Sequence, residues 1–246
     1  MNIKTITYCC YFVIFLLSCP LRVNSATIAV PIVNPGAETG DTSGWNSEGI
    51  TALDSGDHHS GNYHFAVDNN LLDHLLQGAT MGMHQLVDLS AYAGHIQDIS
   101  AKTWALFDSA MAEGLKDGQL YYYPLSASIG FDFYDTGGHH IYGIYETRYQ
   151  SRAWLQFGPS ATNYLYWDQL KDYIGAVDLN VFFQLDTYGK PSIDQLDSIS
   201  WVVSPQNLSL DDVSLEIEVS SSPTPSAILL LVSGLGAIGL FKRKVA

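Results

Sequence analysis

Residues 213–219 read Val-Ser-Leu-Glu-Ile-Glu-Val, so every second side chain is apolar and those between are polar or charged. The same period of two runs through residues 179–186, Leu-Asn-Val-Phe-Phe-Gln-Leu-Asp, and through Ile129, Phe131 and Phe133. Successive side chains of a β-strand point to opposite faces, so each segment has one dry face and one wet face. Antiparallel sheets that pack face to face have this pattern. The sequence therefore predicts an all-β protein with an antiparallel β-sandwich.

Helical periodicity is limited to residues 71–77 and 167–173. No internal repeat or break in composition divides the middle of the chain, which is long enough to bury a sizeable core. We therefore expect one β-sandwich domain over residues 26–219.

The N-terminus has the pattern of an export signal. Lys4 precedes an apolar run over residues 8–17 that contains no acidic residue and is short for a membrane span. Cleavage after Ser25 would place Val23 and Ser25 at the −3 and −1 positions, which predicts a signal peptide over residues 1–25. A permanent N-terminal anchor and acylation of Cys19 at a lipobox-like sequence are the alternatives.

The C-terminus has the pattern of a membrane tail. Residues 220–246 contain Pro223, Thr224 and Pro225, an apolar stretch over 227–241, and then a basic cluster. At ~1.5 Å per residue the apolar stretch forms a transmembrane helix of about 22 Å, short for a hydrocarbon core of about 30 Å. The basic cluster would remain in the cytoplasm, with the domain outside. An ordinary single-pass anchor is the alternative.

This tail resembles the PEP-CTERM sorting signal of Gram-negative bacteria, with Thr224 where Glu is commonest. The resemblance covers about the last 24 residues. It implies processing by an exosortase after signal peptidase, transient anchoring in the inner membrane, and display at the cell surface or in an exopolysaccharide matrix.

Charge and cysteine content limit the function classes. Outside residues 26–222 lie five of the 11 basic residues and none of the 25 acidic ones, so this span has six basic residues and a net charge of −19. Such a domain repels nucleic acid and favours divalent cations such as Ca²⁺. The cysteines are confined to the predicted signal, which excludes disulfides and thiolate chemistry from the domain: Cys9, Cys10 and Cys19.

Five segments resemble, in order, those of the galactose-binding-like jelly rolls, which include carbohydrate-binding modules. They are Asn-Pro-Gly-Ala-Glu-Thr-Gly-Asp-Thr-Ser-Gly-Trp at 34–45, Ser-Gly-Asn-Tyr at 60–63, and the segments at 83–89, 133–138 and 210–215. The resemblance spans most of the domain and implies a jelly-roll fold. Ala37 replaces the usual Phe, so one core anchor is missing.

The resemblance also implies a structural Ca²⁺ bound by Glu38, Asp211 and backbone carbonyls near Ser60 and Gly61. The residues give partial independent support, because strict alternation would place Asp211 on the core side with Val213. A carboxylate buried there must be paired, neutralised or metal-bound. The alternatives are that Asp211 only caps the strand or meets an arginine, and Asp212, on the opposite face, is the second choice as a ligand.

Aromatic residues crowd the middle of the chain. Exposed Tyr and Trp rings stack on sugars, and the resemblance points the same way, so we expect ligand contacts at Tyr122, Tyr142, Trp154 and Trp167. The alternative is that most of these rings are core or sheet residues, as we expect for Trp45.

The sequence contains no HExxH or GxSxG motif. Adjacent histidines such as His139 and His140 would point to opposite faces of a strand and could not chelate a metal together. We therefore predict a non-enzymatic, exported glycan-binding protein. A purely structural surface protein is the alternative, and a glycoside hydrolase using one of the carboxylate pairs is a weaker one.

Overall fold

The architecture is that of a computed structural model, which describes residues 25–54, 58–149, 151–205 and 208–220. The strands in this part are β1 Ser25–Val30, β2 Asn46–Glu48, β3 Ile50–Leu53, β4 His64–Val67, β5 Met81–Asp88, β6 Ile96–Phe107, β7 Met111–Lys116, β8 Gln119–Asp135, β9 His140–Arg148, β10 Ser151–Phe157, β11 Ile174–Leu185, β12 Ser198–Val203 and β13 Ser209–Ser220. The α-helices are α2 Leu72–Leu75 and α3 Trp167–Leu170, both within the segments predicted to be helical. Short 3-10 turns are η1 Asn69–Leu71, η2 Ser90–Tyr92, η3 Ala161–Asn163, η4 Lys171–Tyr173 and η5 Ile193–Gln195.

Residues Thr27–Val219 form one compact unit. The predicted signal peptide and sorting tail, with its transmembrane helix at 227–241 and its Pro223-Thr224-Pro225 motif, lie outside the described residues except for Ser25 and Ser220. Across the part that is described, no helix has the length and apolar character needed to cross a membrane.

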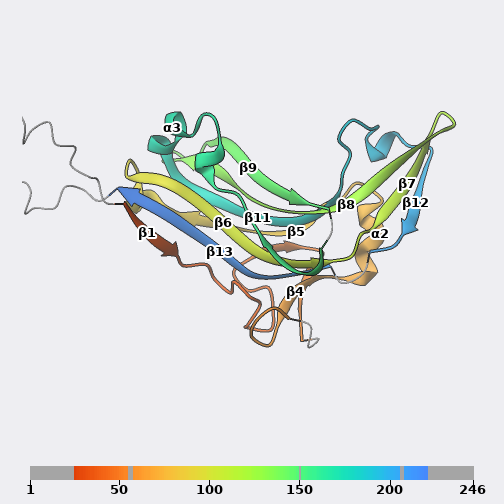
Figure 1. The fold of residues 1–246 in the computed structure, drawn as a ribbon, viewed down its shortest axis with the longest axis horizontal. Coiled ribbons are helices and arrows are strands. Elements are labelled where there is room, and N and C mark those ends of the chain that lie inside the picture. Colours follow the sequence, from red (N-terminus) through yellow and green to blue (C-terminus); the bar gives the residue numbers. More distant parts are fainter. Residues whose placement is uncertain (1–24, 55–57, 150, 206–207, 221–246) are drawn as a thin grey trace, which may run out of the picture. The chain divides into compact units, whose positions relative to one another are not determined.

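Two sheets make up the sandwich (Figure 1). The six-stranded sheet has the order β10-β6-β13-β4-β3, with β1 added to β13. The seven-stranded sheet has the order β12-β7-β8-β11-β5-β2, with β9 added to β8. The registered pairs are antiparallel, as the alternating pattern predicts. An antiparallel β-sandwich of this kind is consistent with a jelly roll.

The core lies between the two sheets and consists of the apolar faces that the sequence predicts. Phe131 on β8, Val181 on β11 and Ile217 on β13 are fully buried. Phe107 on β6 meets Phe183 on β11 edge to face, with ring centroids 5.8 Å apart, so aromatic packing joins the sheets directly. Each such side chain contributes about 1.5–3 kcal/mol on burial. Trp45 is also buried, as expected.

A β-bulge changes the register of β13 and corrects the predicted position of Asp211. Strict alternation places Asp211 on the core side with Val213, but the pairing with β6 shifts between Asp211 and Ser214. Asp212 supplies the extra residue, with a φ of 48°. Asp211 is instead paired with Trp104 and lies on the outer face of the six-stranded sheet. Asp211 is still buried, because the segment around Ser60 covers it.

Candidate functional site

A row of residues crosses five adjacent strands on the outer face of the seven-stranded sheet. Its members, one from each of β2, β5, β11, β8 and β9, are successive cross-strand partners: Asn46, His84, Asn180, Gly130 and Tyr145. Their chain neighbours Met83, Val181 and Ile129 are buried in the core. Because side chains alternate along a strand, the row faces away from the six-stranded sheet. Amide, imidazole and phenol groups thus form one band across the sheet.

Two carboxylates lie opposite each other in the next row, Asp178 on β11 and Asp132 on β8. The Tyr145 hydroxyl donates to Asp132 at 2.5 Å, and the Asn180 amide nitrogen donates to it at 3.3 Å. His84 Nδ1 is 3.0 Å from both oxygens of Asp178. Burial and the hydrogen bond to Asp132 raise the pKa of Tyr145 above its ordinary value. The network holds the phenol protonated and fixes the direction of each polar group.

Two glycines allow the aromatic side chains to lie close to the strands. A Cβ added at Gly130 would lie 2.3 Å from Cδ1 of Tyr145, and one added at Gly82 would lie 2.5 Å from Cβ of Phe182. The Tyr145 and Phe182 rings approach edge to face at 5.7 Å, and Tyr145 is 41% exposed. The face therefore combines aromatic surface with directed polar groups.

Two hollows lie along β11, the first beside β5 and β2 and the second at the C-terminal end of the strand. The first has a volume of about 350 Å³ and is lined by Glu48, His84, Asn180 and Phe182, among others. The second has a volume of about 340 Å³ and is lined by Gln184, Asp194 and residues that precede β5. Asn180 lines the first hollow and Gln184 the second, and these two residues are about 13 Å apart on one face of β11. Such an arrangement can accommodate an extended polar molecule.

The four predicted ligand aromatics do not come together in one place. Tyr122 lies in the first half of β8, where β7 pairs with it, and it hydrogen-bonds to Glu113. Tyr142 is paired with Phe133, at the other end of β8, and stacks on Tyr164 at 4.4 Å. Eleven residues of strand separate these two positions on β8, a distance of about 36 Å.

The two tryptophans are also in separate environments. Trp154 is on β10 in the other sheet, with its ring 5.9 Å from His59. Trp167 is only 4% exposed, and its indole N–H donates to the carbonyl of Gln97 at 2.7 Å. A ring enclosed in this way offers no face to a ligand, so we remove Trp167 from the candidate ligand contacts.

Sequence reasoning identified the polar face of residues 128–133 but did not select its members as a site. The alternation of Ile129, Phe131 and Phe133 predicts that Gly130 and Asp132, which lie between them, are on the face opposite the core. The pairing of β8 with β9 and β11, which brings Tyr145 and Asn180 beside them, has no local signal in the sequence.

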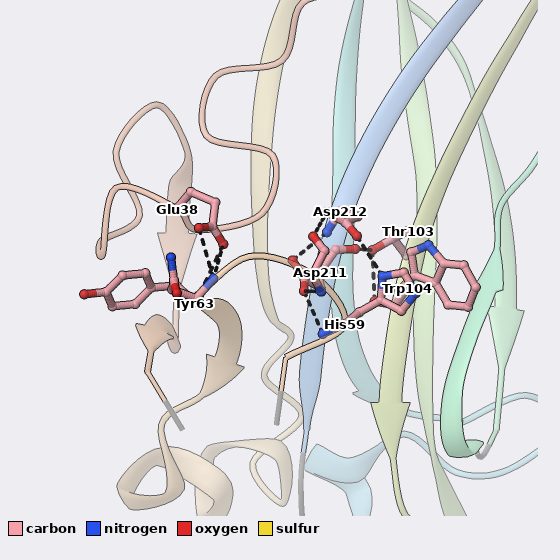
Figure 2. A network of polar contacts seen from close by, with 9 residues as sticks. Glu38, His59, Tyr63, Thr103, Trp104, Asp211 and Asp212 are labelled. Carbon is pink, nitrogen blue, oxygen red and sulfur yellow. Dashed lines mark hydrogen bonds and ion pairs between the residues drawn. The ribbon is translucent and has the colours of Figure 1, made fainter. Parts of the chain in front are cut away.

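The predicted metal ligands lie around one loop, which we call the clasp and define as Glu38, residues 59–63, Asp211 and Asp212 (Figure 2). Asp211 accepts hydrogen bonds from the backbone N–H groups of His59 at 3.0 Å and Ser60 at 3.1 Å, and from that of Asp212 at 2.8 Å. Glu38 accepts from the N–H groups of Asn62 and Tyr63. Both carboxylates thus hold the loop against the body of the domain.

Asp212 and His59 complete the clasp. Asp212 accepts from the Ser60 hydroxyl at 2.7 Å, and its other oxygen is 2.7 Å from Nδ1 of His59. The His59 ring stacks on Trp104 with centroids 3.8 Å apart. Burial, together with the nearby charge of Asp212, raises the pKa of Asp211 against the lowering effect of its hydrogen bonds.

The clasp provides part of the donor set that calcium prefers. Oxygen atoms of Asp211 and Asp212 converge beside Gly36, where an added Cβ would lie 3.0 Å and 3.4 Å from them. Ligand atoms of Asp211, Asp212 and His59 lie within 4.8 Å of one another. The Glu38 carboxylate lies farther along the loop, against Gly61, and does not belong to this group. Asp211 and Asp212 are therefore the residues that fit a Ca²⁺ ion best.

Comparisons with known proteins found no matching family model and no matching curated protein. Among solved structures, TmCBM61 in complex with β-1,4-galactotriose is 14% identical with a TM-score of 0.39, covering 74% of this chain and 94% of that one. The CBM22-1 xylan-binding domain of Paenibacillus barcinonensis Xyn10C is 13% identical with a TM-score of 0.37, covering 76% and 93%. The enzymatically active domain of tailspike protein 4 of bacteriophage CBA120 is 12% identical with a TM-score of 0.43, covering 76% and 21%.

Proposed function

We propose that this protein is a non-enzymatic glycan-binding protein whose binding surface is the outer face of the seven-stranded sheet. The observation that carries the proposal is the row from Asn46 to Tyr145 beside two successive hollows. Sugar recognition needs flat apolar surface together with hydrogen-bonding groups at fixed positions. Tyr145 and Phe182 supply the first, and Asn180 and His84 supply the second.

The spacing of the hollows favours a polymer over a single sugar. Both are lined by residues of β11, so a linear chain running parallel to β11 would contact both. A polymeric ligand also suits the rest of the proposal, which is display at the surface of a Gram-negative cell in association with its exopolysaccharide. This part rests on the signal peptide and sorting tail predicted from the sequence, and sequencing the N-terminus of the exported protein checks the signal peptide.

Replacing Asn180 or Tyr145 by alanine is expected to weaken glycan binding about tenfold each, because each change removes a directed polar or aromatic contact. Isothermal titration of the full-length protein with the glycans retained on an array measures the effect. Tyr122→Ala is the matched control, because this exposed ring lies at the other end of β8. This variant should bind the glycan with unchanged affinity.

Two results would contradict this function. If no glycan is retained, the purely structural alternative holds. If reducing ends are released from a bound glycan and Asp132→Asn abolishes the release, the protein is a hydrolase.

We also propose that the clasp binds a structural Ca²⁺ through Asp211 and Asp212. A saturating ion at 100 times its dissociation constant adds about 2.7 kcal/mol, which raises the melting temperature of a domain of this size by about 5–10 °C. Melting curves in Ca²⁺ and in EDTA measure the shift. Asp212→Asn should abolish it and Glu48→Gln, on the other sheet, should retain it. Identical melting curves in Ca²⁺ and EDTA would mean that the clasp does not bind Ca²⁺.

A further inference from the structure

The outer face of the seven-stranded sheet has a strong excess of negative charge. Glu48 lines the first hollow and Asp194 lines the second, and neither hollow has a Lys or Arg among its described lining residues. Asp132 and Asp178 extend the acidic surface toward β9. Glu48 and Asp194 lie in the hollows, whereas Asp132 and Asp178 lie outside their lining, beside the row of Asn180 and Tyr145.

The pairing of Asp132 with Asp178 has an energetic cost. Like charges directly opposite each other on neighbouring strands are destabilising. Their contacts are His84, His140, Tyr145 and Asn180, and none of these carries a permanent positive charge. The side chains of these acids are only 24% and 16% exposed, so water screens the repulsion incompletely.

The basic side chains that the structure describes are engaged elsewhere. Each has an acidic or amide partner outside the two hollows: Lys102 with Glu216, Lys116 with Gln195, Arg148 with Glu146, Lys171 with Asp168 and Lys190 with Asp186. None of these five side chains is recorded in contact with the Asp132 and Asp178 pair.

We infer that the glycan bound at this face carries free amino groups, as a deacetylated amino-sugar polymer does. The inference rests on the proposed function and names its ligand class. An ammonium group between Asp132 and Asp178 relieves their repulsion and gains charge-assisted hydrogen bonds. A uronic acid or sulfated sugar is repelled, because it brings further negative charge to a surface that is already acidic.

The test compares three oligomers of equal length with the full-length protein: β-1,4-linked glucosamine, the same chain with every amine acetylated, and an oligogalacturonate. We expect the glucosamine oligomer to bind about tenfold or more tightly than its acetylated form, with a preference that shrinks as salt is raised, and the galacturonate not to bind. The double variant Asp132→Asn/Asp178→Asn should bind the glucosamine oligomer and its acetylated form with similar affinity.

The matched control is Asp168→Asn/Glu218→Gln, which changes the net charge equally but lies on α3 and on β13 of the other sheet. It should keep the full preference for free amines. Loss of the preference in this control means that net charge attracts the oligomer without a site, and that overturns the inference. Equal or tighter binding of the acetylated oligomer by the unmodified protein also overturns it while leaving glycan binding intact. Failure of every glycan tested removes the proposed function itself.

Discussion

Asp211→Ala is expected to lower the free energy of unfolding by about 3–5 kcal/mol, because it removes a buried carboxylate that accepts hydrogen bonds from three backbone N–H groups at once. Asp211 has no exposed surface, and its oxygens receive the N–H groups of His59, Ser60 and Asp212. Without the carboxylate these donors have no partner, and the loop at 59–63 separates from β13. Chemical denaturation of the full-length protein measures the loss.

One change of buffer and two further variants test whether the loss of stability comes from the N–H contacts of Asp211. Most of the decrease in the free energy of unfolding should remain when it is measured in EDTA, because the N–H contacts require no metal. Asp211→Asn should also be destabilising, since its NH₂ group would face N–H donors where the carboxylate oxygen accepts them. Asp212→Ala, whose side chain is 35% exposed, should lose about 1 kcal/mol. A loss below about 1 kcal/mol for Asp211→Ala would mean that the clasp does not hold the loop.

The fold was predictable because its signal is local. Alternation at 213–219 and 179–186 directly reports which side chains face the core, and Val181 and Ile217 lie there as predicted. The position of Asp211 was not predictable in the same way, since it depends on one residue, Asp212, that adopts a positive φ. Nothing in a period-two pattern marks a bulge, and one extra residue moves every side chain before it to the other face.

The candidate site required information that the sequence does not contain locally. His84, Asn180 and Tyr145 are far apart in the chain and meet only because β5, β11, β8 and β9 are neighbours in one sheet. The aromatic content pointed to sugar stacking, yet composition does not distinguish a buried ring from an exposed one. Trp167 begins α3 with its side chain inside the protein, whereas its neighbour Tyr166 is exposed.

Trp167→Ala is therefore expected to lower the free energy of unfolding by about 3–5 kcal/mol while leaving the glycan affinity of the folded protein unchanged. The indole ring packs 5.7 Å from Phe133 in the core, and its N–H satisfies the Gln97 carbonyl. Removing it leaves a cavity and an unpaired acceptor. Denaturation and titration, each performed on the same preparation, measure the two quantities.

Two further variants, Trp167→Phe and Tyr166→Ala, separate the contributions of ring packing and of the indole N–H to this loss of stability. The first keeps most of the ring packing and removes only the N–H donor, so about 1–2 kcal/mol should be lost. The second truncates an exposed ring one residue earlier and should change stability by less than about 0.5 kcal/mol. If Trp167→Ala remains stable but no longer binds glycan, the ring contacts the ligand and its place in the core is wrong. If it loses stability and the folded fraction binds normally, the tryptophan stabilises the sandwich and does not contact the ligand.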